Sequence, residues 1–241
     1  MTQILIGHSR AGTSWLSDHF SKVYGRHWWD EYFTHMKKRV LADPKPNRVL
    51  TPEERNLAFH EGKKLLDDDQ SKGQEYFIKY HVSMITRLDR LYPNWWDQFY
   101  KDYEKIYLYN RNVWRIFLSR TYQENVEEAS PTLWKKTDSM LKPFSVDVKS
   151  IIRFARQYKD YVMFDRYDTF WDYDTLTDQY IAEYIGGEPK PKVVPTRYDY
   201  AAYLQHLDLV KEILYIELES MLPKKQFDDL EWSDTTQKGR K

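Results

Sequence analysis

Residues 4–16 have the pattern of a strand, a glycine-bounded loop and the start of a helix. Residues 4–6 are a short apolar run, the loop covers 7–14, and an amphipathic stretch follows. Gly7 and Gly12 are spaced as in the phosphate-binding loop G-x-x-x-x-G-K-[ST]. Backbone N–H groups that converge at a helix N-terminus bind anions. The segment therefore predicts an anion-binding loop between a strand and a helix.

One position departs from that loop pattern. Thr13 stands where the phosphate-binding loop carries lysine, and Arg10 is a cation inside the loop. A strand-to-helix turn with incidental glycines explains the same residues without a ligand. This stretch alone leaves both interpretations open.

The composition excludes several functional classes. The chain has 241 residues, with 37 Lys and Arg against 37 Asp and Glu and no cysteine. Balanced charge gives no global field that attracts nucleic acid or an anionic membrane, so anion binding must be local. The absence of cysteine removes disulfide frameworks, thiolate metal sites and cysteine nucleophiles.

The length and hydropathy predict a soluble, cytoplasmic protein. The size is typical of one domain, so we expect a single domain over 1–241, with a flexible polar tail from about residue 234. The first residues lack the layout of a signal peptide, and no apolar run approaches the roughly 18–20 residues of a membrane span. Neither nucleic acid nor a membrane is an expected partner.

Two further predicted strands end in polar residues. Lys79 and His81 close the run 76–82 and are two apart, which puts both side chains on one sheet face. Ligands bind at the carboxyl edge of strands in open α/β sheets. A structural histidine is the simpler explanation for a lone His in a strand, but a Lys and a His together at that edge favour a ligand site.

The predicted strand 105–109 leads to Arg111, and Ser119 lies about two turns into the helix that follows. Both side chains have positions from which they would reach one phosphate. An arginine that caps acidic surface, with a solvent-facing serine, explains the same spacing.

Strand–helix alternation over the whole chain predicts an α/β fold with a mainly parallel sheet of at least four strands. The helix that starts at Thr51 has a capping box with Glu54 and is expected to bury Leu57 and Leu65. The remaining expected elements are a short buried strand at 161–164 and helices at 14–24, 51–67, 83–91, 113–122, 146–158, 175–185 and 198–222.

Several of these stretches, in this order, resemble the sulfotransferases that use 3′-phosphoadenosine 5′-phosphosulfate (PAPS). Residues 9–15, S-R-A-G-T-S-W, resemble the family's Pro-[Lys/Arg]-Ser-Gly-Thr-[Thr/Ser]-Trp motif, which accounts for Thr13. Residues 78–81, I-K-Y-H, resemble the strand that ends in Lys-Thr-His. Arg111 and Ser119 keep the family's spacing of Arg and Ser, and residues 166–168, R-Y-D, resemble its Arg-Tyr-Glu strand end.

The resemblance covers residues 4–187 and has departures. Ser9 and Ala11 replace the Pro and Ser of the first motif, and the proline that follows the family's third-motif arginine is missing. The C-terminal Arg-Lys-Gly loop, which holds the 3′-phosphate in the family, has only residues 238–240 as a poor substitute.

The resemblance implies a three-layer P-loop-like fold, with a central mainly parallel sheet flanked by helices, and transfer of a sulfuryl group from PAPS to a hydroxyl or amine. By analogy with phosphoryl transfer, positioning and charge stabilisation dominate. The resemblance makes His81 the general base, since imidazole titrates near neutral pH, and Lys79 the group that neutralises the transferring sulfuryl. The implied cofactor-binding residues, the first of them also catalytic, are Arg10, Ala11, Gly12, Thr13, Ser14, Trp15, Arg111, Ser119 and Tyr167.

No metal is required by this chemistry, and the product is adenosine 3′,5′-bisphosphate. The acceptor is expected to be a small molecule, a glycan or a peptide, bound by the variable aromatic segments near 27–36 and 83–100. Two other classes remain open. One is a non-catalytic nucleotide- or partner-binding protein of the same fold, and the other is a P-loop kinase.

Overall fold

The computed structural model describes residues 3–24, 27–29, 51–73, 76–127, 142–190 and 200–233. The chain divides into two compact units. The first unit consists of Met1–Gly7, Gly12–Leu108 and Asp165–Val193, and the second of His8–Ala11, Tyr109–Phe164 and Val194–Lys241. The loop after the first strand therefore contributes residues to both units.

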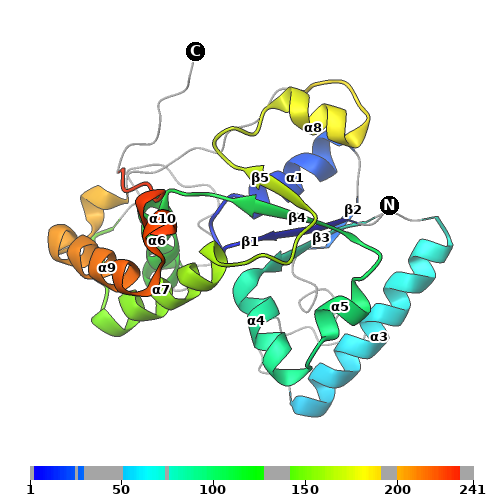
Figure 1. The fold of residues 1–241 in the computed structure, drawn as a ribbon, viewed down its shortest axis with the longest axis horizontal. Helices are drawn as coiled ribbons and strands as arrows, with labels where there is room; N and C mark the ends of the chain where they lie inside the picture. The colour runs from blue at the N-terminus through cyan, green and yellow to red at the C-terminus, as the bar shows by residue number, and fades with distance from the viewer. Residues whose placement is uncertain are drawn as a thin grey trace. The chain divides into compact units, whose positions relative to one another are not determined.

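The first unit contains a sheet in which four strands are parallel (Figure 1). The strand order is β2-β3-β1-β4-β5. β1 pairs in parallel with β3 and with β4, and β2 pairs in parallel with β3. The mainly parallel sheet expected from the sequence is confirmed. The strand bounds are β1 Gln3–Gly7, β2 His27–Trp29, β3 Tyr76–His81, β4 Glu104–Tyr109 and β5 Thr169–Asp172.

Helices flank this sheet. Figure 1 shows α1 and α8 over one face, and α3, α4 and α5 on the other. None of the helices within the described ranges combines the length and the apolar character needed to cross a bilayer. The helix bounds in this unit are α1 Thr13–Tyr24, α3 Pro52–Ser71, α4 Val82–Leu91, α5 Trp95–Phe99 and α8 Asp178–Ile185.

Alternation along β3 decides which helices its side chains meet. The ring of Phe77 stacks on Phe20 of α1 at 4.5 Å between centroids. Tyr80 points to the other face, where its hydroxyl lies 2.7 Å from that of Tyr100 and its ring packs edge-on against Trp96. Since side chains alternate along a strand, Lys79 shares the face of Phe77, and this is the face that α1 covers.

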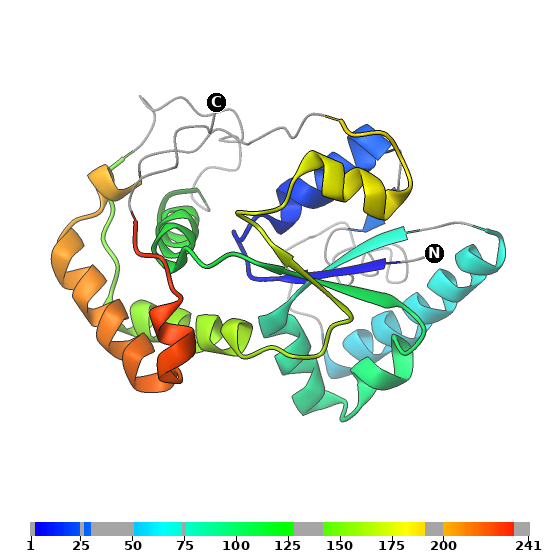
Figure 2. The same ribbon diagram turned by 45° about the horizontal axis from the view of Figure 1, so that its top comes forward.

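The second unit is helical. α7 and α9 pack along each other, and α10 follows against α9 (Figure 2). α6 contributes a largely buried surface in which Trp114 and Phe117 stack at 5.5 Å, and Phe117 meets Phe154 of α7 edge-on. The elements are α6 Val113–Tyr122, the π-helical turn η1 Gln123–Glu127, α7 Val148–Val162, the 3-10 turn η4 Ala201–Tyr203, α9 Leu207–Met221 and α10 Lys224–Asp228.

The helix-start signal at Thr51 is confirmed, but α3 is longer than predicted. Glu54 N donates to Thr51 Oγ1 at 3.2 Å, and Thr51 N donates to Glu54 Oε2 at 2.9 Å. α3 continues to Ser71, and two pairs one turn apart, Lys63–Asp67 and Lys72–Asp68, add a small stabilisation near its C-terminal end. Leu57, expected to be buried, is 48% exposed. The helix turns its polar faces outward and buries Ala58 instead.

The prediction of a strand at 161–164 is wrong. Tyr161 and Val162 continue α7, whose buried residues Phe154, Tyr158 and Tyr161 keep helical spacing. The fifth strand lies at 169–172 instead. The helix predicted at 198–222 is also shorter, because a turn at 204–206 separates η4 from α9. Of the segment 27–36, residues 30–36 lie outside the described residues, as does the tail from 234.

Gly12 is a position where the fold requires glycine. Its φ is +101°, and a Cβ there would overlap the Tyr173 ring. Gly73 has a φ of +80°, and no atom lies within 4 Å of a Cβ placed there. A substitution at Gly73 therefore introduces backbone strain without steric crowding.

We expect Gly12→Ala to lower the free energy of unfolding by about 2–4 kcal/mol, since left-handed strain adds to overpacking. Gly73→Ala carries the strain alone and should cost about 1 kcal/mol. Denaturant unfolding of both variants measures the difference. Equal losses would mean that the Tyr173 ring moves aside freely.

Candidate functional site

The loop between β1 and α1 begins in the second unit. His8–Ala11 forms a tight turn in which Ala11 N donates to His8 O at 3.1 Å. Arg10 takes a left-handed conformation with φ of 70°. The His8 ring is 3% exposed and meets the rings of Tyr158 and Tyr161 edge-on at 5.7 and 5.5 Å. The start of the loop is therefore anchored by a buried aromatic ring.

Asn110 ties the loop to the residues that follow β4. Its side-chain Nδ2 donates to Ala11 O at 3.4 Å, and its Oδ1 accepts from Asn112 N at 3.1 Å. Its backbone N donates to the Tyr161 hydroxyl at 2.7 Å, and the Tyr158 hydroxyl donates to its carbonyl at 3.0 Å. Sequence reasoning missed Asn110, because nothing near it in the chain marks these distant partners.

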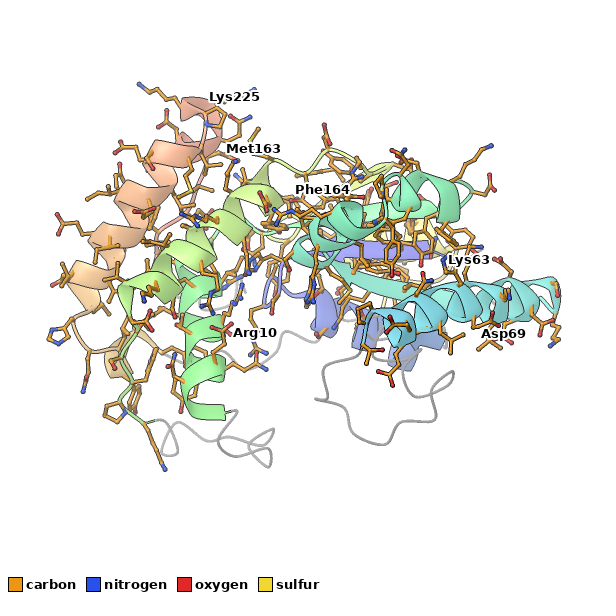
Figure 3. The ribbon with its side chains drawn as sticks, turned by 90° about the horizontal axis from the view of Figure 1, so that it is seen from below. Arg10, Lys63, Asp69, Met163, Phe164 and Lys225 are labelled. Carbon is orange, nitrogen blue, oxygen red and sulfur yellow. The ribbon has the colours of Figure 1, made fainter. Side chains whose placement is uncertain are left out.

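Arg10 is fixed by α6. Its Nε donates to Ser119 Oγ at 2.9 Å, and Figure 3 shows the labelled side chain beside that helix. Both residues are partly exposed. Two predicted cofactor-binding residues, 109 positions apart, are thus directly bonded in the second unit.

The rest of the loop belongs to the first unit. Thr13, which replaces the P-loop lysine, is 1% exposed. A Cβ on Gly7 would overlap the Thr13 methyl group, so Thr13 packs against the end of β1, where only glycine leaves room. The α1 helix then begins with Leu16 N bonded to Gly12 O at 3.0 Å. Position 13 therefore supplies packing and no positive charge.

Lys79 brings a positive charge to the first turn of α1. Its side chain is buried, with 2% of the residue exposed, and Nζ donates to Ser14 Oγ at 2.9 Å. Ser14 itself is exposed and lies in the first turn of α1, which has no acidic residue. The positive end of the helix dipole and an ammonium group therefore meet at one hydroxyl, and this arrangement favours an anion.

His81 lies two residues further along β3. It is half-buried, pairs in register with Gly7 of β1, and is the residue before α4, with φ −91° and ψ 140°. Alternation places its side chain on the Lys79 face of the sheet, as the sequence predicted. The first unit thus brings together the 12–14 part of the loop, a buried lysine and a histidine at the carboxyl ends of β1 and β3.

The other predicted residues have structural partners. Arg111 Nη1 pairs with Asp229 Oδ1 at 3.4 Å. Tyr167 stacks on Tyr107 at 5.0 Å, and Arg166 of the same motif pairs with Asp89. Trp15 lies in α1. Ser119 therefore accepts from Arg10, the arginine of the loop, whereas Arg111 pairs with Asp229.

Within the described residues no group of three or more histidines and carboxylates is arranged to hold a metal ion. Comparison with known proteins gives no family model, no curated protein and no solved structure that matches the chain.

Tyr158 offers a test of the loop anchor. Burial raises the pKa of its hydroxyl well above 10, with the neighbouring Tyr109 and Tyr161 adding to the shift. The hydroxyl stays protonated in the folded protein, where it donates to the Asn110 carbonyl.

We expect Tyr158→Phe to lower the free energy of unfolding by about 1–3 kcal/mol, because the Asn110 carbonyl loses a buried donor. Tyr215→Phe, on an exposed part of α9, should change it by less than about 0.5 kcal/mol. The raised pKa also predicts that parental stability falls above about pH 10, by up to 1.4 kcal/mol per pH unit, since the unfolded chain releases the proton first. Tyr158→Phe lacks this part of the slope, and identical alkaline slopes would contradict the assignment.

Proposed function

We propose that the protein is a PAPS-dependent sulfotransferase with the three-layer P-loop-like fold that its motifs suggest. The observation that carries the proposal is the bond between Lys79 Nζ and Ser14 Oγ. Through this bond the buried ammonium group of Lys79 lies at the first turn of α1, next to Thr13, which replaces the P-loop lysine. The order of the sequence motifs supports the same assignment.

We assign the phosphosulfate and the 3′-phosphate to different residues. Lys79, Ser14 and the amides after Gly12 hold the 5′-phosphosulfate. Arg10 was predicted at that end, but its bond to Ser119 favours the 3′-phosphate end, which Arg111 and Ser119 serve. A 3′-phosphate is the group that distinguishes PAPS from ATP and AMP.

The chemistry follows from charge placement. The acceptor oxygen or nitrogen attacks sulfur, the new bond to sulfur forms, and the bond from sulfur to the phosphate oxygen breaks. Lys79 stabilises the negative charge that develops on the phosphate leaving group. His81 accepts the proton that the acceptor loses. Adenosine 3′,5′-bisphosphate and the sulfated acceptor are the products.

A P-loop kinase is the weaker alternative. Its lysine would stand at position 13, where the side chain packs against Gly7. A non-catalytic binding protein would keep Lys79 and Ser14 but has no need of His81.

The experiment compares Lys79→Met, His81→Ala and the control Lys105→Met, which changes a strand lysine on the opposite sheet face. Release of adenosine 3′,5′-bisphosphate from PAPS is followed with a mixture of phenol, alcohol and amine acceptors. We expect Lys79→Met to weaken nucleotide binding about 10- to 100-fold, as lost charged hydrogen bonds do. His81→Ala should lower turnover about 10²–10⁴-fold and leave nucleotide binding within about twofold.

Lys105→Met should behave like the parent. Normal turnover in folded His81→Ala would remove the general base, and normal binding in Lys79→Met would remove the phosphosulfate site. Turnover that depends on ATP and Mg²⁺ in place of PAPS would favour a kinase.

A further inference from the structure

A C-terminal segment of the second unit lies against the residues that follow β4. Glu231 N donates to Arg111 O at 2.9 Å, and Glu231 and Asn112 form a parallel β-bridge. Asn112 Nδ2 donates to Ser233 Oγ at 3.0 Å. Residues 229–233 therefore act as a strap across the 111–112 turn, a segment we call the C-terminal strap.

The strap is fixed from beneath. Leu230 in the strap and Phe227 in α10, just before it, are 8% and 7% exposed. Phe227 packs edge-on against Tyr215 of α9 at 4.8 Å. Buried anchors of this kind on either side of Asp229 hold its backbone next to Arg111.

Asp229 pairs with the arginine that the proposed function gives to the 3′-phosphate. Its Oδ1 lies 3.4 Å from Arg111 Nη1, with 54% of the Asp229 side chain and 30% of the Arg111 side chain exposed. A phosphate that reaches Arg111 would meet an arginine already paired with a carboxylate. The pair has no net charge, whereas an arginine alone offers one positive charge.

We propose that Asp229 is an affinity-setting residue, which lowers the affinity of Arg111 for the 3′-phosphate and so favours release of the product nucleotide. This inference rests on the proposed function. A carboxylate at roughly 6 Å from a phosphate dianion opposes its binding by about three- to tenfold, even in a water-like dielectric. Without this opposition, two arginines would hold the bisphosphate product more tightly.

The test is calorimetric binding of adenosine 3′,5′-bisphosphate and of AMP to the parent, to Asp229→Asn and to Asp228→Asn. Asparagine keeps an oxygen that accepts from Arg111, so the arginine stays in position while the negative charge is removed. Asp228 is the exposed neighbour at the end of α10, and its substitution makes the same change in net charge.

We expect Asp229→Asn to bind the bisphosphate about three- to tenfold more tightly and AMP unchanged. Asp228→Asn should stay within about twofold for both nucleotides.

Three results would overturn the inference: unchanged or weaker binding in Asp229→Asn, equal tightening in Asp228→Asn, or equal tightening for AMP. In each of these the parent still prefers the bisphosphate, so the proposed function stands. A parent that binds the bisphosphate no better than AMP removes the 3′-phosphate site itself, and the role of Asp229 with it.

Discussion

The buried ammonium group of Lys79 is the feature on which the proposed site depends. A charged group with 2% exposure is costly to bury unless oxygens surround it. Ser14 Oγ accepts from it at 2.9 Å, and this contact directs the ammonium to the first turn of α1. Packing of Phe77 against Phe20 fixes the sheet face that points to that helix. The fold of the first unit thus concentrates positive charge where the loop begins its helix.

The loop serves two units with one continuous stretch of chain. His8–Ala11 belongs to the second unit and is bonded through Arg10 to Ser119, and Gly12 onward belongs to the first. Each unit therefore contains a cation bonded to a serine hydroxyl. The strap that brings Asp229 to Arg111 is part of the second unit alone.

Local sequence patterns predicted many of the secondary-structure elements. The glycine spacing, the capping box at Thr51 and the strands around Lys79 and Arg111 depend on neighbours in sequence, and the structure confirms those elements. The sequence did not predict contacts between residues far apart in the chain. Asn110 bonds to Ala11, 99 positions away, and Arg111 to Asp229, 118 positions away. The apolar run 161–164 suits a strand or a helix equally, and the spacing to Phe154 and Tyr158 in α7 decides for the helix.

The most direct measurement is a thermal-shift comparison of adenosine 3′,5′-bisphosphate with ATP and Mg²⁺ on the whole chain. A ligand at about 100 times its dissociation constant adds roughly 2.7 kcal/mol to the free energy of unfolding. We predict a shift of this size for the bisphosphate and a much smaller one for ATP with Mg²⁺. A larger shift with ATP and Mg²⁺, or none with the bisphosphate, would contradict the assignment of Lys79, Arg10 and Ser119 to a PAPS site.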